Sequence, residues 1–245
     1  FRRVLFRSIS AEPLLANLTD FQRAALGRLV VMVNEMQQSL NLTAIRDQHA
    51  MVRYHLADSM ALLPVLDSVG MPDVKVAVDI GTGGGFPLLP LAIVRGDIHW
   101  IGVESVQKKA AAAQKMGHLL ELNNIELRAE RAEDVARGEL RDNVDLVTAR
   151  AVGPIASLLE VGMPLLKSGG RICLFKTETA RKEWDACTAV IERLGGIPSG
   201  ECKYTLEGDE QERVIFIAEK TAESPEDFPR RAGVPFRKPL AGKNV

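Results

Sequence analysis

Cysteines, aromatic residues and long apolar runs are all scarce in this 245-residue chain. The three cysteines, Cys173, Cys187 and Cys202, are odd in number and widely spaced, which fits neither a disulfide framework nor a zinc pattern. We therefore expect reduced thiols that only pack, as in a soluble cytoplasmic protein. No apolar run is long enough to cross a bilayer, which excludes a membrane-spanning role. Residues 1–8 lack a starting methionine and precede no signal-type apolar core, so we expect no function from them; a truncated or non-native end would explain them.

Basic and acidic residues are also nearly balanced, since the formal net charge is −1. That value argues against a generic nucleic-acid binder. After Asp227, however, the chain carries no acidic residue and five basic ones: Arg230, Arg231, Arg237, Lys238 and Lys243. Such a tail can contact phosphates, but solvated basic tails are also common, and composition does not decide between them.

The first part of the chain has helical patterns. Thr19 and Gln22 have the spacing of a capping box, and apolar residues then recur at helical spacing from Phe21 to Leu40. After a break at Asn41–Thr43, a second helix is expected from Asp47 to near Asp67, ending before Gly70 and Pro72. Residues 1–74 are therefore predicted to form a helical extension.

From residue 75, short β-rich runs alternate with helical ones, which predicts a mostly parallel sheet with helices on both faces. The expected strands are Val76–Ile80, Trp100–Val103, Ile125–Arg128, Val144–Thr148 and Arg171–Phe175, with helices at Lys108–Leu122 and Ile155–Leu166. Two last runs, Glu201–Thr205 and Arg213–Ala218, flank a polar turn and indicate an antiparallel hairpin. We expect residues 75–220 to form the main α/β domain, residues 221–245 to form a basic tail, and the whole chain to be compact.

A glycine-rich loop follows the first of these strands. Asp79 and Ile80 lead into Gly81-Thr82-Gly83-Gly84-Gly85, and Phe86-Pro87 then starts a helix. Strand, glycine turn and helix N-terminus make a nucleotide-binding corner, because glycine lets the backbone approach a ligand closely. A dinucleotide-binding motif requires a third glycine at the position where this chain has Phe86. No lysine follows the loop, which excludes a phosphate-binding P-loop. The spacing therefore favours S-adenosylmethionine.

Polar residues follow the neighbouring strands as well. Glu104 ends the second strand, about 20 residues beyond the loop, where an acid can accept both ribose hydroxyls. Arg131-Ala132-Glu133-Asp134 follows the third strand, and Arg150 ends the fourth. A glycine cluster alone is often a tight turn, and a lone glutamate is often solvated, but their joint spacing favours a cofactor site. A nicotinamide oxidoreductase remains the alternative at this level.

These motifs make the chain resemble the bacterial RsmG (GidB) family, over nearly everything from Asn41 to Leu240. The shared segments are NLTAIRD (41–47), HLADS (55–59), DIGTGGGFP (79–87), RAED (131–134), TARA (148–151) and PRRAGVP (229–235). The glycine loop occurs in many methyltransferases, whereas the HLADS and PRRAGVP segments are much more specific. Leu88 and Thr177 depart from the family pattern, which often has glycine at both positions.

The resemblance implies a class I, Rossmann-like methyltransferase that modifies guanine N7 in 16S ribosomal RNA of the small subunit, at guanine 527. It implies that Gly81 and Phe86 line the cofactor site, that Ala132 and Glu133 meet the adenine, and that Arg150 contacts the cofactor. Together with the loop and strand-end residues, the expected cofactor-binding set is Asp79, Gly81, Gly83, Gly85, Phe86, Glu104, Ala132, Glu133 and Arg150. The expected RNA-binding set is Arg230, Arg231, Arg237 and Lys238.

No catalytic residue or metal is expected, because guanine N7 carries a lone pair and no proton. Alignment of N7, methyl carbon and sulfur can then supply most of the rate enhancement. Arg150 and Lys176 are candidates on the substrate side. His55, Asp58 and Ser59 share one helical face, where side chains do not converge as in a hydrolase triad; a structural network and a substrate-side role are equally supported. A protein or small-molecule methyltransferase and a non-catalytic RNA-binding module remain rivals.

Overall fold

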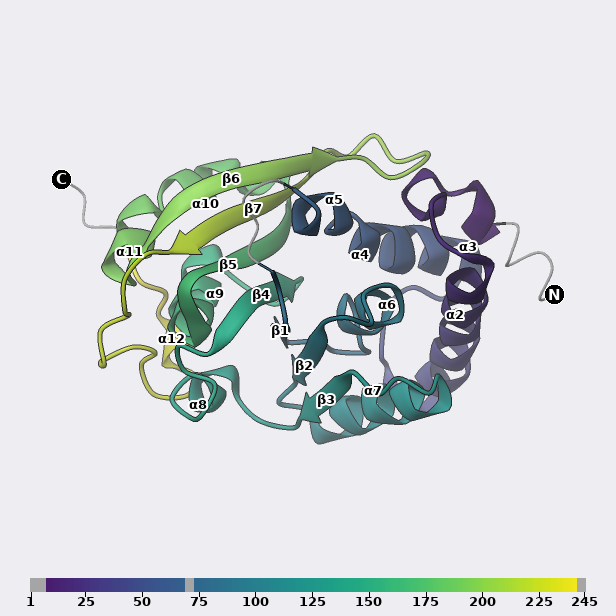
Figure 1. Cartoon of the computed structure of the whole chain (residues 1–245), viewed down its shortest axis with the longest axis horizontal. Coiled ribbons are helices and arrows are strands. Elements are labelled where there is room, and N and C mark those ends of the chain that lie inside the picture. The colour runs from purple at the N-terminus through teal and green to yellow at the C-terminus, as the bar shows by residue number, and fades with distance from the viewer. Residues whose placement is uncertain (1–7, 69–72, 242–245) are drawn as a thin grey trace.

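The computed structural model describes residues 8–68 and 73–241. Its centre is a seven-stranded sheet in the order β3-β2-β1-β4-β5-β7-β6 (Figure 1). The strands are β1 (Val76–Ile80), β2 (His99–Val103), β3 (Ile125–Arg128), β4 (Val144–Arg150), β5 (Leu166–Thr177), β6 (Gly196–Tyr204) and β7 (Arg213–Lys220). Strands β1 to β5 are parallel, and β7 lies antiparallel between β5 and β6. The predicted α/β fold with an antiparallel C-terminal hairpin is confirmed.

Helices cover both faces of this sheet. Successive strand residues point to opposite faces, so Ala77 and Leu146 join one apolar cluster while Val78 and Val147 join the other. The first cluster packs against α2 (Asp20–Leu40), α3 (Gln48–Met51), α4 (Asp58–Met60), α5 (Leu63–Leu66), α6 (Leu88–Val94) and α7 (Gln107–Leu119). The second packs against α8 (Ala132–Val135), α9 (Ile155–Gly162), α10 (Arg181–Asp185) and α11 (Thr188–Arg193). The strands are apolar because they are buried on both sides.

The first long helix, α2, begins as expected but differs from expectation in one apolar residue. Both halves of the capping box form: Thr19 Oγ1 accepts from the Gln22 backbone N–H at 3.2 Å, and Gln22 Oε1 accepts the Thr19 N–H at 2.9 Å. Phe21, expected on the apolar face, is 81% exposed, because the helical repeat turns it away from the buried face that contains Leu29 and Val33.

The second expected helix is broken into short pieces. Asp47 caps its start by accepting the Ala50 N–H at 2.8 Å, but a π-helical turn, η2 (Val52–Ala57), separates α3 from α4. The expected stop at Gly70 and Pro72 lies outside the described residues. Helical residues such as Leu29 and Leu56 share one cluster with Ala77 in the sheet, and the domain boundaries at residues 74 and 220 stay predictions.

Several elements have different ends from those expected. β5 begins at Leu166 rather than Arg171, because the predicted helix before it stops at Gly162. After β7 the chain forms the short helix α12 (Val234–Arg237). The three cysteines are free. Across the described residues, none of the helices combines the length and the apolar character that crossing a membrane requires.

Candidate functional site

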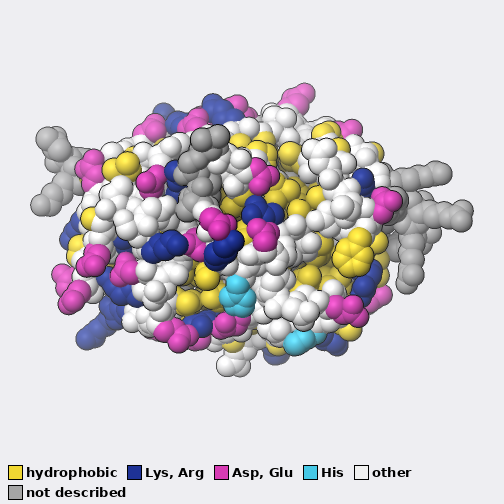
Figure 2. Space-filling view, viewed as in Figure 1, with side chains coloured by type: hydrophobic (Ala, Val, Ile, Leu, Met, Phe, Trp, Pro, Cys, Tyr) yellow, Lys and Arg dark blue, Asp and Glu magenta, His cyan; other side chains and the backbone are white. Residues whose placement is uncertain are grey.

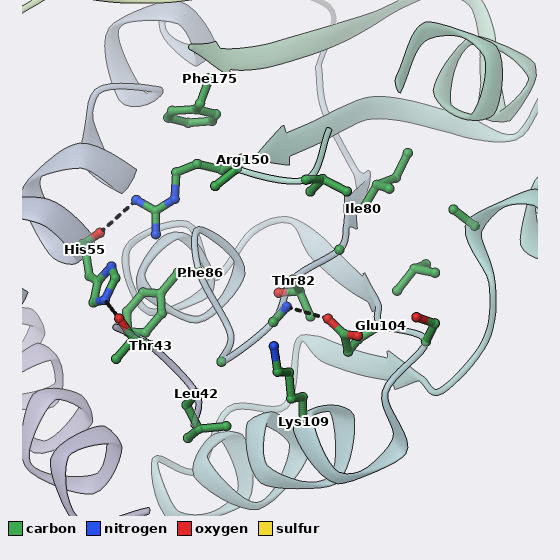
Figure 3. Close-up of a pocket in the computed structure, with 18 of the residues that line it drawn as sticks. Leu42, Thr43, His55, Ile80, Thr82, Phe86, Glu104, Lys109, Arg150 and Phe175 are labelled. Atoms are coloured by element: carbon green, nitrogen blue, oxygen red, sulfur yellow. Dashed lines mark hydrogen bonds between the residues drawn. The ribbon is translucent and has the colours of Figure 1, made fainter. Parts of the chain in front are cut away.

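A cavity of about 800 Å³ opens where β1, β2 and β4 end, the edge at which open α/β sheets bind ligands. Its walls come from the glycine loop, η2, the strand ends, the hairpin and the C-terminal segment. Figure 3 shows His55 of η2, the loop residues Thr82 and Phe86, and Glu104 and Arg150 at strand ends. Both tyrosines of the chain, Tyr54 and Tyr204, line it. The structure brings together the following expected residues: Gly81, Gly83, Phe86, Glu104, Ala132, Glu133, Arg150 and Lys176.

The glycine loop is hydrogen-bonded to the end of β2, and there is open space next to Gly83 in the loop. The N–H groups of Gly81 and Thr82 donate to the Val103 carbonyl at 2.8 and 3.2 Å. Gly81 has φ +68°, and a Cβ there would meet Val152 Cγ2 at 2.7 Å. Gly83 has φ +56°, and a Cβ there would meet only the Gly81 carbonyl, at 3.9 Å. The positive φ favours glycine, and the open space at Gly83 gives a ligand room to approach the backbone.

Glu104 stands directly after β2 and binds the loop. Its Oε2 accepts the Gly83 N–H at 3.0 Å, and its Oε1 accepts the Val106 N–H at 2.8 Å. These two bonds orient the carboxylate beside the loop; Figure 3 shows the bond to the loop backbone. A carboxylate held in this way can accept further hydrogen bonds from a ribose.

Asp79 and Gly85, two expected cofactor residues, are not among those that line the cavity. Asp79 is fully buried below the loop, where the Thr148 hydroxyl donates to its Oδ1 at 2.8 Å. Burial raises the pKa of Asp79 to about 6, and the Thr82 and Thr148 hydroxyls oppose that rise. A Cβ on Gly85 would lie 2.4 Å from Leu89 Cδ1. Both residues therefore shape the loop from beneath rather than face a ligand.

Arg150, at the end of β4, is paired with a carboxylate from the N-terminal helices. Its Nη1 lies 2.6 Å from Asp58 Oδ2, and both side chains are nearly buried. Asp58 Oδ1 also accepts from the Tyr204 hydroxyl at 2.8 Å and lies 3.8 Å from Arg213 Nε. Burial, together with Asp58, raises the pKa of Tyr204, which keeps its hydroxyl protonated. The network ties η2 and α4, β4 and the hairpin together around one side of the cavity.

His55 is stacked on Phe86, with ring centroids 4.5 Å apart. Its Nε2 lies 2.7 Å from Thr43 Oγ1. Burial, and secondarily the charge of Arg150, lowers the pKa of His55 to about 3, so the ring is neutral at neutral pH. Ser59 Oγ donates to the His55 carbonyl at 2.6 Å. The His55 ring bonds Thr43, the Asp58 carboxylate bonds Arg150 and Tyr204, and the Ser59 hydroxyl bonds a backbone carbonyl. This arrangement agrees with the exclusion of a hydrolase triad.

Lys176 lies at the far side of the cavity, near the end of β5. Its Nζ donates to the Gly153 carbonyl at 2.5 Å, and burial lowers its pKa. Among the described residues, no group of His, Cys, Asp and Glu side chains is arranged to hold a metal ion.

Comparisons with known proteins agree with this geometry. A family model described as rRNA small subunit methyltransferase G matches residues 22–207. The chain belongs to the rRNA small subunit methyltransferase G family. The curated protein of that name from Lactobacillus acidophilus is 34% identical over 224 residues, covering 91% of this chain and 93% of its own. The one from Staphylococcus saprophyticus is 31% identical over 226 residues, covering 92% and 93%.

Solved structures with much lower identity share the fold. A SAM-dependent O-methyltransferase from Thermotoga maritima matches with a TM-score of 0.51 and 15% identity, over 80% of this chain and 72% of its own. A protein of M. jannaschii in complex with AdoMet matches with a TM-score of 0.50 and 18% identity, over 65% and 76%. The Rossmann-like methyltransferase fold predicted from the sequence is confirmed.

The basic tail of this family member is largely built into the fold. Arg230 donates from Nε and Nη2 to Glu160, at 2.8 and 2.6 Å, and Glu160 is fully buried. The expectation that Arg230 offers a free charge to RNA therefore has to be revised, because its guanidinium neutralises a core carboxylate. Arg231, Arg237 and Lys238 are exposed, and Lys243 lies outside the described residues. On the face in Figure 2, basic and acidic side chains are intermixed.

Sequence reasoning missed several residues of the cavity wall. Leu42, Phe175, Tyr204 and Phe236 all line it. Leu42 lies in the NLTAIRD segment and Phe175 ends an expected strand, so both carried a usable signal. No local sequence pattern predicts that Tyr204 and Phe236 line the cavity, because only tertiary packing brings them there. Of the two departures from the family pattern, Leu88 is buried in α6, and Thr177 lines the cavity.

Proposed function

We propose that this chain transfers a methyl group from S-adenosylmethionine to N7 of a guanine in 16S ribosomal RNA of the small subunit. S-adenosylmethionine is the methyl donor and ribosomal RNA is the acceptor, in line with membership of the rRNA small subunit methyltransferase G family. Guanine 527 is the position that the resemblance of the motifs implies.

The cofactor side of the cavity suits an adenosine-bearing molecule. Gly83 leaves open space over the loop, and the Glu104 carboxylate lies beside it at the end of β2. Gly81, Gly83, Glu104, Ala132 and Glu133 would hold the cofactor, which supplies a methyl group already activated on a sulfonium. Because it has no pyrophosphate, the cofactor needs no third glycine at the position of Phe86.

The observation that carries the proposal is that one cavity joins this cofactor side to a second, aromatic and basic side. That second side includes Tyr54, Phe86, Arg150, Tyr204 and Arg213. A volume of about 800 Å³ is within the range of ligand sites, and enzymes that modify a base inside structured nucleic acid extrude it into such a pocket.

The ionisable groups on the second side suit a reaction that needs no general base. His55 is neutral and bonded to Thr43, and Asp58 is paired with Arg150. Neither is an unpaired base, and methylation of guanine N7 removes no proton in the transfer step. These residues orient the acceptor and exclude water, while alignment of the reacting atoms contributes roughly 7–11 kcal/mol in favourable cases.

A labelling experiment separates this proposal from its rivals. Labelled S-adenosylmethionine is incubated with small subunits that lack the modification, with naked ribosomal RNA and with total protein, and modified nucleosides are identified by mass spectrometry. Label in 7-methylguanosine is expected. Label in protein would favour a protein methyltransferase, and no transfer to any acceptor would favour a non-catalytic RNA-binding module.

A further inference from the structure

Side chains from the α8–β4 region and from α9 hold the last part of the chain against the rest of the fold through hydrogen bonds. We call residues 224–238 the C-terminal strap. Its backbone carbonyls accept hydrogen bonds from Arg137, Arg141 and Ser157; the bonds are Arg141 Nη2 to Ser224 at 2.8 Å, Arg141 Nη1 to Phe228 at 2.8 Å, Arg137 Nη2 to Pro229 at 2.6 Å and Ser157 Oγ to Pro235 at 2.9 Å. With the Arg230–Glu160 ion pair, these bonds define one path for the strap.

That path brings Phe236 to the cavity. Phe236 lines it together with Ala132 and Val152, and all three are partly buried against the same apolar cluster. A Cβ on Gly153 would lie 3.0 Å from Phe236 Cδ1, so the glycine lets the ring lie close to the end of β4. The three side chains make an apolar wall on the side of α8.

The strap also holds the carboxylate next to this wall. Glu133 Oε1 accepts the Gly233 N–H at 2.7 Å, and the side chain is only 2% exposed. Gly233 has φ +78°, a conformation that favours glycine and that presents this amide at the start of α12. The orientation of Glu133 in the cavity therefore depends on a residue 100 positions later in the chain.

A ligand bound at Glu104 would extend toward this wall. The chain returns from the end of β3 to α8, which packs against α9 and contacts the strap through Glu133 and Gly233. Glu104, Ala132 and Phe236 therefore line the same cavity. A ribose at Glu104, with its remaining substituent at the glycine loop, directs its base toward Ala132 and Glu133. Adenine has flat apolar faces and a hydrogen-bonding edge, which match an apolar wall beside a carboxylate.

We propose that Phe236, which the C-terminal strap holds in the cavity wall, is an adenine-binding residue. The inference rests on the proposed function, because it requires S-adenosylmethionine to occupy this cavity. It gives the strap a role at the cofactor pocket, in addition to the RNA contacts that the sequence predicts for its exposed basic residues.

Calorimetric titration tests the inference with two probes, S-adenosylmethionine and 5′-methylthioadenosine, which has the adenosine but no amino acid end. Phe236→Ala is expected to weaken both probes by a similar factor of about ten, because only adenine contacts are lost. Phe21→Ala is the matched control, since Phe21 is 81% exposed and lies in α2, which does not line the cavity. It should bind both probes as the wild type does.

The outcomes separate this inference from the proposed function. If Gly83→Val abolishes binding while a folded Phe236→Ala binds both probes within twofold of wild type, the inference is wrong and the proposed function stands. If the wild type binds neither probe, the proposed function fails and the inference fails with it. If thermal melting shows that Phe236→Ala does not fold, Phe236→Leu decides, because it keeps apolar volume but loses the flat ring. Weakened binding of both probes supports the inference, and unchanged binding overturns it.

Discussion

Gly83 and Glu104 show how single residues combine conformation and chemistry at this site. A positive φ is tolerated at Gly83 because it has no Cβ, and the Gly83 N–H then reaches Glu104 Oε2 at 3.0 Å. Arginines show how a neighbour decides a role: Arg150 and Arg230 both pair with largely buried carboxylates, but only Arg150 lines the cavity. The sequence identifies the residue types, and the tertiary neighbours determine what each can do.

At Gly83, substitution by valine is expected to abolish measurable affinity for S-adenosylmethionine, because the side chain would occupy the open space over the loop. Gly169→Val is the control, since Gly169 also has a positive φ and no atom within 4 Å of a Cβ but does not line the cavity. Backbone strain should lower the stability of both variants similarly. Calorimetry should show binding only for wild type and Gly169→Val; retained affinity in Gly83→Val would contradict the assignment of the loop.

At Asp79, the raised pKa predicts a pH-dependent loss of stability. A carboxyl whose folded pKa is about 6, above its ordinary value of 3.8, favours folding fully below pH 3.8, and this contribution is lost as pH rises through 6. Asp79→Asn lacks this titration and can still accept from Thr148. The free energy of unfolding of the variant, relative to wild type, should therefore rise by up to about 3 kcal/mol from pH 4 to pH 7. Parallel stability curves from urea unfolding would contradict this.

Among the elements, the strands were the most predictable part of the fold. Val76–Ile80 and Ile125–Arg128 have the predicted bounds, because buried strands show as short apolar runs between turn residues. The π-helical turn η2 was not predictable, since its residues have ordinary helical spacing. It carries Tyr54 and His55 into the cavity wall, and π-turns inside α-helices occur often at functional sites.

Between elements, the hydroxyl of Tyr204 in β6 joins the hairpin to Asp58 in α4. Tyr204→Phe removes one hydrogen bond to a carboxylate and should lower the free energy of unfolding by about 2 kcal/mol. In Asp58→Asn the same substitution should cost less, because the charged acceptor is gone. A double-mutant cycle by urea unfolding measures this coupling, and additive single effects would show that the contact contributes nothing.

Across the whole molecule, the central strand ends form one part of the cavity, and η2 and the C-terminal strap complete its walls. The fold class and most of the cofactor side could be predicted, because strand ends of a parallel sheet meet at one edge. The contribution of the strap could not, since Arg230, Gly233 and Phe236 reach their partners Glu160, Glu133 and Gly153 only through tertiary packing. The basic character of residues 228–245 was correctly noted, but Arg230 pairs with the fully buried Glu160.

Substitution by alanine should therefore lower stability much more at Arg230 than at its neighbour Arg231. Arg230→Ala leaves the buried Glu160 carboxylate unpaired and should lower the free energy of unfolding by about 3 kcal/mol. Arg231→Ala removes an exposed side chain and should change stability by less than about 0.5 kcal/mol. Urea unfolding of the two variants measures this, and equal effects would contradict the structural role of Arg230.

RNA binding should depend on the exposed cations of the strap. Replacing Arg231 and Lys238 by alanine is expected to weaken ribosomal RNA binding and to reduce its salt dependence, because fewer counterions are released. Arg237 is kept, since its Nε donates to the Gly233 carbonyl at 3.1 Å. S-adenosylmethionine affinity should stay as in the wild type. Filter binding at several salt concentrations checks this, and an unchanged salt slope would remove the strap from the RNA interface.

The position of the methyl group tests the central claim most directly. Small subunits lacking the modification are treated with S-adenosylmethionine and either the wild type or Gly83→Val, and nuclease fragments of the 16S ribosomal RNA are weighed by mass spectrometry. We expect one added methyl group at guanine N7, in the fragment that contains guanine 527, with the wild type and none with Gly83→Val. A methyl group on another atom or nucleotide, or equal methylation by both proteins, would contradict the account.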